Sequence, residues 1–249
     1  MATHGGPNLV DEGLVFWIDA GQLSFTSGST TIDNMASNNE GELFCTVTGS
    51  YNEDPHYWSF DHTQDRIELD SEIELGVSCS IEMWGKKYAG SQIYGTQLYS
   101  PEYHTAGPNN NGVQLYFVSN KKLQFATANS QDYRCYVDFS ETYTDEYYQN
   151  GINHLVITRA VNDNVGYTAN ECKLYINGVL KQTLYESRTA SNGVASTTFP
   201  NKVGVIGRDS NESFRGALNC MRLYRGKTLS AQEVQQNFNA VKNKITNSL

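Results

Sequence analysis

Apolar and polar residues alternate along most of this 249-residue chain, which is the period of β-strands with one buried face. Residues 216–225 show the pattern clearly, because Met221 and Leu223 alternate with Arg222 and Tyr224. Such alternation predicts an all-β chain. The predicted strands cover residues 14–19, 43–48, 57–60, 65–69, 78–88, 113–119, 121–126, 132–139, 153–161, 171–177, 179–185, 203–207 and 216–225.

Two turns in this pattern predict β-hairpins. Asn177 and Gly178 separate two strand-like runs, and Asn-Gly favours the type I′ turn, whose twist matches that of the flanking strands. Residues 113–118 and 122–125 form a second candidate hairpin. Residues 155–157 are apolar on both faces, which predicts a central strand covered on both sides.

A helical pattern lies near the C-terminus, at residues 230–244. Ser230 precedes Glu233 by three residues, the spacing of a capping box in which each side chain bonds the other's backbone N–H. Leu229 and Val234 occupy the positions of a hydrophobic staple. Many strands followed by one short helix predict an antiparallel β-sandwich with a C-terminal helix laid against it.

Several stretches of the chain resemble, in family order, the laminin-G-like, concanavalin A-like jelly-roll domains. They are residues 59–61 with 65–69, 79–84, 153–158 with 173–180, and 203–224 with the helix start at 229–233. The first strand, within residues 13–20, is similar to versions of this domain found in virion proteins of tailed phages. The resemblance covers most of the chain and implies a concanavalin A-like β-sandwich.

The chain is expected to divide into an arm and one domain. No Pro-rich or Ser-rich linker interrupts residues 13–249, which we assign to the concanavalin A-like sandwich. Residues 1–12 are predicted to form an extended N-terminal arm, because Gly5, Gly6 and Pro7 do not sustain a helix. The arm shows no apolar periodicity that would pack it against the core of its own domain.

Charge and composition disfavour several classes of partner. The chain carries 18 Lys and Arg against 27 Asp and Glu, a net charge of −9 without any Lys/Arg cluster, so nucleic acids and anionic membrane surfaces are disfavoured. No apolar run approaches the roughly 18 residues that a membrane span needs. Residues 1–8 lack a secretory signal, so we expect synthesis in a host cytoplasm. In that setting the isolated cysteines are predicted to be buried thiols: Cys45, Cys79, Cys135, Cys172 and Cys220.

One acidic stretch is the candidate catalytic site. Glu68, Asp70 and Glu72 share one face of a strand, and this spacing resembles the E-x-D-x-E strand of laminarinase-type glycosidases of the same fold, which use two carboxylates. However, Ser71 stands where that motif has an apolar residue, and the flanking residues are aliphatic rather than an aromatic platform. We therefore predict that the chain is not an enzyme, with a glycoside hydrolase as an alternative.

The resemblance also implies a candidate calcium site at the rim of the sandwich, where relatives use aspartates and carbonyl groups. Asp61 and Asp65 lie on the matching loop, with Asp19 nearby after the first strand. Asn219 replaces an aspartate that such domains often carry, so one charged ligand is missing. An Asx-turn role for Asp61 is favoured, and no cofactor is required.

Loops rich in tyrosine are the candidate ligand-binding segments, because tyrosine offers both apolar area and a hydroxyl group. They lie at residues 89–112 and 140–151, with related long loops at 20–42, 162–170 and 186–202. These side chains would stack on sugar rings or fill a protein interface. The candidate residues are Trp84, Tyr88, Tyr94, Tyr99, Tyr103, Tyr143, Tyr147 and Tyr148.

The sequence thus predicts a protein that binds rather than catalyses. The resemblance implies a structural protein of a tailed-phage virion, in the capsid decoration, neck or tail, with a capacity to bind glycans on a host or particle surface. Its partners would be other virion proteins, in multicopy or homo-oligomeric form. The first alternative is a stand-alone carbohydrate-binding or adhesin module.

Overall fold

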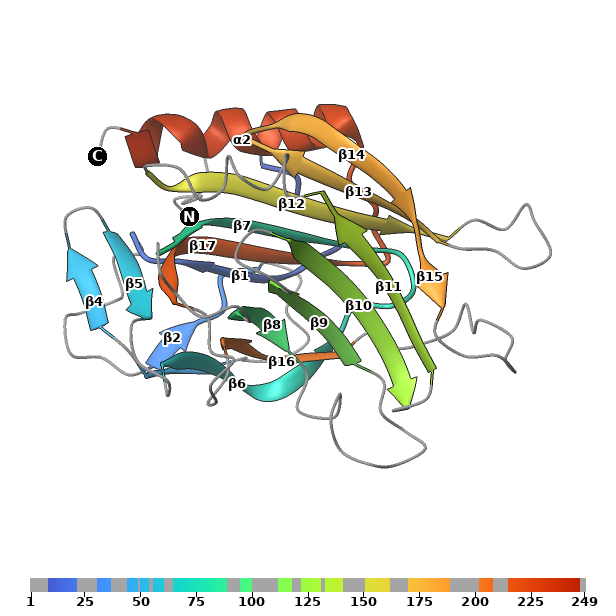
Figure 1. The fold of residues 1–249 in the computed structure, drawn as a ribbon. Helices are drawn as coiled ribbons and strands as arrows, with labels where there is room; N and C mark the ends of the chain where they lie inside the picture. Colours follow the sequence, from blue (N-terminus) through green and yellow to red (C-terminus); the bar gives the residue numbers. More distant parts are fainter. Residues whose placement is uncertain are drawn as a thin grey trace.

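Two antiparallel sheets stack face to face in the computed structural model, with a helix along one outer face (Figure 1). The structure describes residues 9–21, 31–36, 44–48, 50–53, 56–60, 65–88, 95–99, 112–117, 122–130, 133–140, 151–161, 170–188, 202–207 and 215–246. The antiparallel β-sandwich with a C-terminal helix that the sequence predicts is confirmed. In the part of the chain that is described, no helix has the length and apolarity needed to cross a bilayer.

The first sheet, which we call sheet A, carries the long apolar strands. Its order is β14 (Val179–Tyr185), β13 (Glu171–Ile176), β12 (Asn153–Ala160), β7 (Cys79–Lys87), β17 (Gly216–Arg225), β5 (His56–Phe60) and β4 (Ser50–Glu53), and β1 (Leu14–Asp19) also pairs with β17. β12 lies in the interior of this sheet, between β13 and β7, and is buried on both faces, as its continuous apolar run predicts.

The second sheet, sheet B, is built from shorter and more polar strands. Its order is β15 (Ser187–Arg188), β11 (Tyr133–Phe139), β10 (Leu123–Ser130), β9 (Gly112–Phe117), β8 (Gly95–Tyr99), β16 (Lys202–Gly207), β6 (Arg66–Glu74), β3 (Phe44–Thr48) and β2 (Thr31–Asp33). The sequence pattern missed β2, β4, β8 and β15, because each has at most five residues and little apolar alternation.

The core fills the space between the two sheets. Alternate residues of each strand point inward, including Phe16, Ile81 and Leu155 from sheet A and Leu115 and Phe125 from sheet B. Each of these side chains is at most 1% exposed. Their burial supplies the main driving force for folding, at about 1.5–3 kcal/mol for each fully buried side chain of this size.

The hairpin between β13 and β14 has the turn that its sequence predicts. Asn177 has φ 51° and Gly178 has φ 79°, so both central residues occupy the left-handed region that a type I′ turn requires. Asn177 also accepts a hydrogen bond through Oδ1 from the backbone N–H of His154, at 3.0 Å. The hairpin is thereby tied to the central strand β12.

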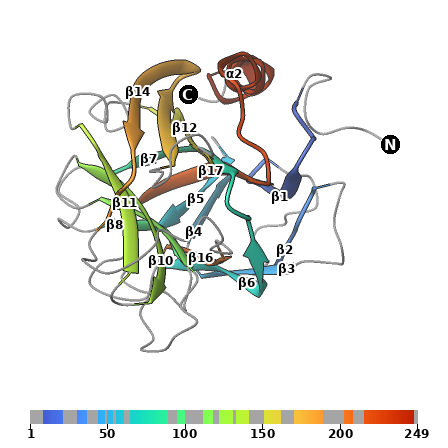
Figure 2. The same ribbon diagram turned by 90° about the vertical axis from the view of Figure 1, so that its right-hand side faces the viewer.

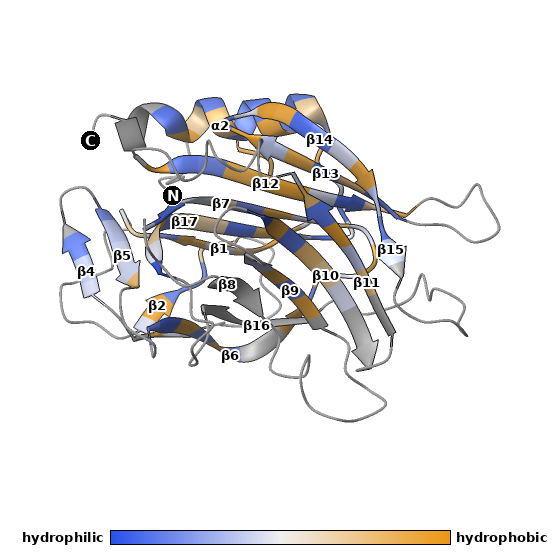
Figure 3. Ribbon diagram, viewed as in Figure 1, coloured by the Kyte–Doolittle hydropathy of each residue, from blue (hydrophilic) through white to orange (hydrophobic). Residues whose placement is uncertain are grey.

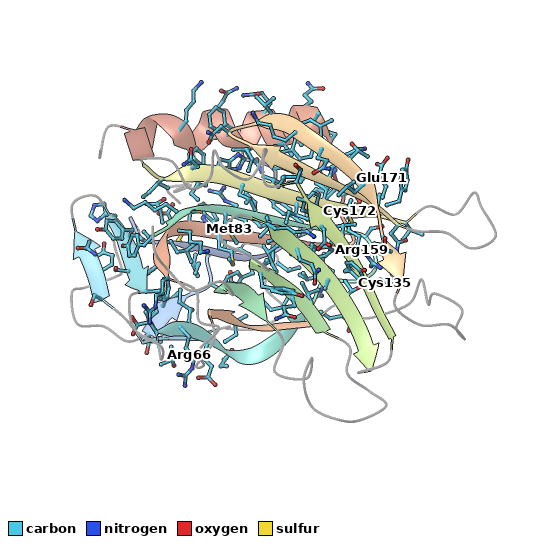
Figure 4. The ribbon with its side chains drawn as sticks, in the orientation of Figure 1. Arg66, Met83, Cys135, Arg159, Glu171 and Cys172 are labelled. Atoms are coloured by element: carbon cyan, nitrogen blue, oxygen red, sulfur yellow. The ribbon has the colours of Figure 1, made fainter. Side chains whose placement is uncertain are left out.

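The chain crosses from sheet A to sheet B at Glu186, between β14 and β15. Arg159 on β12 donates two hydrogen bonds to this carboxylate, from Nε to Oε1 at 2.6 Å and from Nη2 to Oε2 at 3.2 Å. Both side chains are buried. Asn170 donates to Glu186 Oε2 at 2.8 Å, and Arg159 Nη1 donates to the Val77 carbonyl at 2.7 Å. Figure 4 shows Arg159 beside Cys172, its register partner on β13.

Helix α2 (Ala231–Thr246) covers the outer face of sheet A (Figure 2). Its capping box is confirmed, because Ser230 N donates to Glu233 Oε2 at 2.8 Å and Glu233 N donates to Ser230 Oγ at 3.3 Å. Hydrophilic and hydrophobic residues interleave along this helix (Figure 3). The apolar ones, Val234 and Val241 among them, are buried against the sheet.

Residues 9–12, assigned from the sequence to a free arm, pack on their own domain. Val10 is buried, and its backbone N–H donates to Asn237 Oδ1 of α2 at 2.9 Å. Glu12 forms an ion pair with Lys227 at 2.9 Å. The expectation that the arm makes no contact with its own core is therefore wrong for Leu9 and Val10, which pack against buried apolar residues of the domain. Residues 1–8 lie outside the described residues.

Candidate functional site

One face of sheet B points away from the core and gathers aromatic and amide side chains. Backbone register aligns Glu68 on β6, Val205 on β16, Tyr99 on β8, Gln114 on β9, Ala126 on β10 and Tyr136 on β11 into one row across the sheet. Directly opposite residues of antiparallel strands share a face. The neighbours of these residues along β9, β10 and β11 fill the core, so the row lies on the outer face.

A second row runs beside the first and is joined by hydrogen bonds. Tyr116, Gln124 and Asp138 are register partners on β9, β10 and β11. The Tyr116 hydroxyl donates to Gln124 Oε1, and Gln124 Nε2 donates to Asp138 Oδ1 at 2.6 Å. Lys122 Nζ lies 2.9 Å from Asp138 Oδ2. This chain of bonds fixes the orientation of the Tyr116 ring and of the Gln124 amide.

Ala126 lies between two tyrosine rings at the centre of these rows. Tyr116 and Tyr136 both pack against it and remain half-buried, while Ala126 itself has no exposed surface. Gln114 and Gln124 are buried beside it. We call these five residues the tyrosine platform. A small residue flanked by two rings leaves apolar ring area in reach of solvent, and the tyrosine hydroxyl groups can act as donors or acceptors.

Trp84 does not belong to any exposed site, and its assignment as a ligand-binding residue is wrong. Its side chain is 2% exposed on the face of sheet A beneath α2. The ring stacks on Phe238 with centroids 5.5 Å apart and 3° between the planes, and it lies 4.8 Å from the ring of His154. A strand residue pointing away from the central core is here covered by the helix, so Trp84 has no surface to offer a ligand.

The other predicted aromatic residues fall into two groups. Tyr88 is half-buried at the end of β7, where its hydroxyl lies 3.0 Å from Ser59 Oγ. Tyr99 is placed by its backbone within the platform row, next to Gln114. The side chain of Tyr99 is not among those described. The remaining predicted residues lie outside the described residues: Tyr94, Tyr103, Tyr143, Tyr147 and Tyr148.

The candidate catalytic carboxylates lie at the other end of the same outer face. Glu68 and Asp70 are exposed on β6, and Glu68 forms an ion pair with Arg66 at 3.2 Å. Figure 4 places Arg66 and Cys135 of β11 at opposite sides of sheet B. A glycosidase general acid is typically enclosed by apolar groups. Neither of these two side chains has such an enclosure, and the side chain of Glu72 is not described.

The structure describes the candidate calcium ligands only in part. Asp65 is buried, and Asp19 accepts a hydrogen bond from Gly21 N at 2.9 Å in its own turn. Asn219 donates to the His56 carbonyl. Among the described residues, no three His, Cys, Asp or Glu side chains are grouped to hold a metal ion. Asp61 lies outside these residues, so the calcium site stays a prediction.

Four of the five cysteines can be followed in the structure. Cys79, Cys135, Cys172 and Cys220 are buried free thiols. Burial raises the pKa of Cys79 to about 12, against the opposing effect of the Arg159 charge. Such thiols are poor nucleophiles, because the thiolate is the reactive form. The prediction of buried cysteines is confirmed for these four, and the side chain of Cys45 is not described.

Tyr116 and Tyr136 are absent from the predicted ligand-binding residues, which were chosen in and beside the tyrosine-rich loops. The signal that would have found them is the phase of alternation within β9 and β11. Leu115 and Val137 point into the core, so the tyrosine beside each of them must point outward. An outward aromatic residue on a predicted strand is therefore as informative as one in a loop.

Family comparison identifies the class of protein. Residues 61–235 match the family described as the concanavalin A-like lectin/glucanases superfamily, and the chain belongs to this family. The resemblance noted in the sequence is confirmed. Comparison with curated protein sequences gives no match.

Solved structures share the fold at low sequence identity. The binding domain of Paraclostridial Mosquitocidal Protein 1 is 17% identical with a TM-score of 0.60, over 94% of this chain and 53% of that one. A structure of botulinum neurotoxin type C is 14% identical with a TM-score of 0.59, over 93% of this chain and 52% of that one. The route of that toxin into cells depends on interaction with two ganglioside molecules. Trypanosoma rangeli sialidase in complex with the inhibitor DANA is 12% identical with a TM-score of 0.57, over 94% of this chain and 34% of that one.

This chain spans about half the length of the two toxin structures. Identity at this level establishes the common fold and leaves function to be argued from the residues of the chain itself.

Proposed function

We propose that this chain is a non-catalytic glycan-binding domain whose binding surface is the tyrosine platform of sheet B. The observation that carries the proposal is Ala126 flanked by Tyr116 and Tyr136 on a face that points away from the core. Sugar rings present apolar C–H faces and hydroxyl groups, and the two half-buried tyrosines match both with their aromatic rings and hydroxyl groups. Membership of a lectin and glucanase superfamily supports this ligand class.

The absence of catalysis is part of the proposal. Exposure of Glu68 and Asp70 supports it, because an enclosed acid is typical of the glycosidase mechanism. By register, Glu68 lies five strand steps from Tyr136, roughly 24 Å at about 4.8 Å per step. A sugar ring stacked on the platform would therefore not reach these carboxylates.

We further propose a setting in a tailed-phage virion, in association with other virion proteins and in several copies. This rests on the resemblance of the first strand, within residues 13–20, to virion versions of the domain. Mass spectrometry of purified particles should detect the chain as a stoichiometric component. If the chain is absent from purified phage particles, the virion proposal is wrong, and the alternative of a stand-alone carbohydrate-binding or adhesin module replaces it.

The platform is tested by removing its rings. Tyr116→Ala and Tyr136→Ala should each weaken binding of neutral oligosaccharides by about tenfold or more, the loss expected for about 1.4 kcal/mol of contact energy. Isothermal titration calorimetry against an oligosaccharide that binds the unchanged protein measures this. Tyr185→Ala is the matched control, because Tyr185 is 56% exposed on β14 of sheet A. Equal losses in all three variants would contradict a site on sheet B.

A further inference from the structure

The charged groups beside the tyrosine platform are paired with each other. Asp138 is the register partner of Gln124 on the platform face. Its Oδ1 accepts from Gln124 Nε2 at 2.6 Å, and its Oδ2 lies 2.9 Å from Lys122 Nζ. Both side chains are only partly exposed, at 29% for Asp138 and 38% for Lys122. Lys122, two residues before Gln124 on β10, is thus already held by a carboxylate.

The far end of the same face adds negative charge. Arg66 is paired with Glu68 on β6, while Asp70 and Glu74 are exposed on that strand. Among the side chains described on this face, both cations, Lys122 and Arg66, therefore have carboxylate partners. The whole chain has a net charge of −9, so the electrostatic potential that it adds at longer range is also negative.

These charges bear differently on neutral and acidic sugars. A sugar carboxylate or sulfate that docks on the platform loses hydration, and this loss is large unless a cation replaces the water. A neutral sugar needs only donors and acceptors, and the hydroxyl groups of the half-buried Tyr116 and Tyr136 are of that kind.

We infer that the ligand of the platform is an uncharged oligosaccharide and that acidic glycans, such as sialylated or sulfated ones, are selected against. The inference rests on the proposed glycan-binding function and narrows it to one chemical class. The specificity-determining group is the Lys122–Asp138 pair, because Asp138 occupies the ammonium group that would otherwise be offered to an acidic sugar beside Gln124.

The test compares neutral oligosaccharides, each with its sialylated or sulfated counterpart, as immobilised probes for the whole chain. We expect each neutral glycan that binds to do so about tenfold or more tightly than its acidic counterpart at low salt. Raising the ionic strength should narrow the ratio, since the screening length falls from about 30 Å at 0.01 M to about 10 Å at 0.1 M. Asp138→Asn removes the negative charge that pairs with Lys122, and it should shift the acidic-to-neutral ratio toward the acidic glycan.

The outcomes separate the two proposals. If no glycan of either kind binds, the proposed function itself fails. If glycans bind but the acidic form binds as tightly as the neutral form, the uncharged class is wrong. Arg134 aligns by register with Ala128 on the same face, so Arg134→Gln is the second variant. Loss of acidic-glycan binding in Arg134→Gln would show that this face recognises acidic sugars and would overturn the inference.

Discussion

Replacing Glu82 by glutamine is expected to lower the free energy of unfolding by about 3–5 kcal/mol, because it removes the charge that balances a buried arginine. Glu82 and Arg222 are both completely buried on β7 and β17, with Oε1 2.6 Å from Nη1. The Glu82 carboxylate also accepts from Asn237 of α2 at 2.8 Å and from the Tyr224 hydroxyl at 3.2 Å. His154 Nε2 lies 3.1 Å from Oε1.

The hydrogen-bonded groups around Glu82 make the stability of the protein depend on pH. Burial by itself would raise the pKa of Glu82, but the Arg222 charge and the bonds from His154 and Asn237 outweigh it and hold the pKa at about 2, against an ordinary 4.5. Below about pH 4.5 the unfolded chain takes up a proton that the folded chain does not, so the stabilisation falls as the pH falls. The stability difference between the natural chain and Glu82→Gln should therefore narrow between about pH 4.5 and pH 2.

Urea unfolding at several pH values measures both effects. Glu68→Gln is the matched control, since its exposed ion pair with Arg66 contributes at most about 1 kcal/mol. The double variant Glu82→Gln/Arg222→Gln should lose less stability than the sum of the single variants, because both partners of the pair are neutralised together. If Glu82→Gln lowers the free energy of unfolding by as little as Glu68→Gln does, the result would contradict a buried charge pair beneath α2.

Replacing Trp84 by alanine is expected to cost about 3–5 kcal/mol of stability while leaving glycan binding unchanged. Trp84 fills the space between β7 and α2, where its ring stacks on Phe238 and lies against His154. Truncation leaves a cavity at the point where the helix is attached. The affinity for a neutral oligosaccharide should not change at a temperature where the variant is folded, because the tyrosine platform lies on the other sheet.

The two readouts separate packing from binding at Trp84. Chemical denaturation reports the stability, and calorimetric titration of the folded variant reports the affinity. Tyr185→Ala serves as the aromatic control, since its exposed ring should contribute within about 0.5 kcal/mol. A stable Trp84→Ala variant that no longer binds glycans would restore the assignment of Trp84 as a ligand residue.

Local patterns predicted much of the fold. Alternation located the long strands, Asn177-Gly178 specified its turn, and Ser230 with Glu233 specified the start of α2. Each of these signals is contained within a few neighbouring residues. The order of the strands within each sheet is not encoded in such local signals, because pairs such as β7 with β17 join residues that are more than 100 positions apart.

The candidate site was harder to predict because it depends on what covers each face of a sheet. Trp84 and Tyr136 both lie on the outer side of a strand, yet α2 covers the first and leaves the second in contact with solvent. The docking of Val10 on Asn237 is likewise a tertiary contact, between residues 227 positions apart. Strand periodicity gives the face of a residue, whereas its exposure is decided by packing between elements.

The central claim is that a glycan binds on the outer face of sheet B, and mapping of backbone amide shifts by nuclear magnetic resonance tests it most directly. Titration of the whole chain with a neutral oligosaccharide that it binds should perturb residues 112–117, 122–127 and 135–139, which carry the tyrosine platform. The amides of α2 and of β12 should remain unchanged. Perturbations confined to α2 and sheet A, or to residues 89–94 and 141–150 within the predicted tyrosine-rich segments, would contradict the claim.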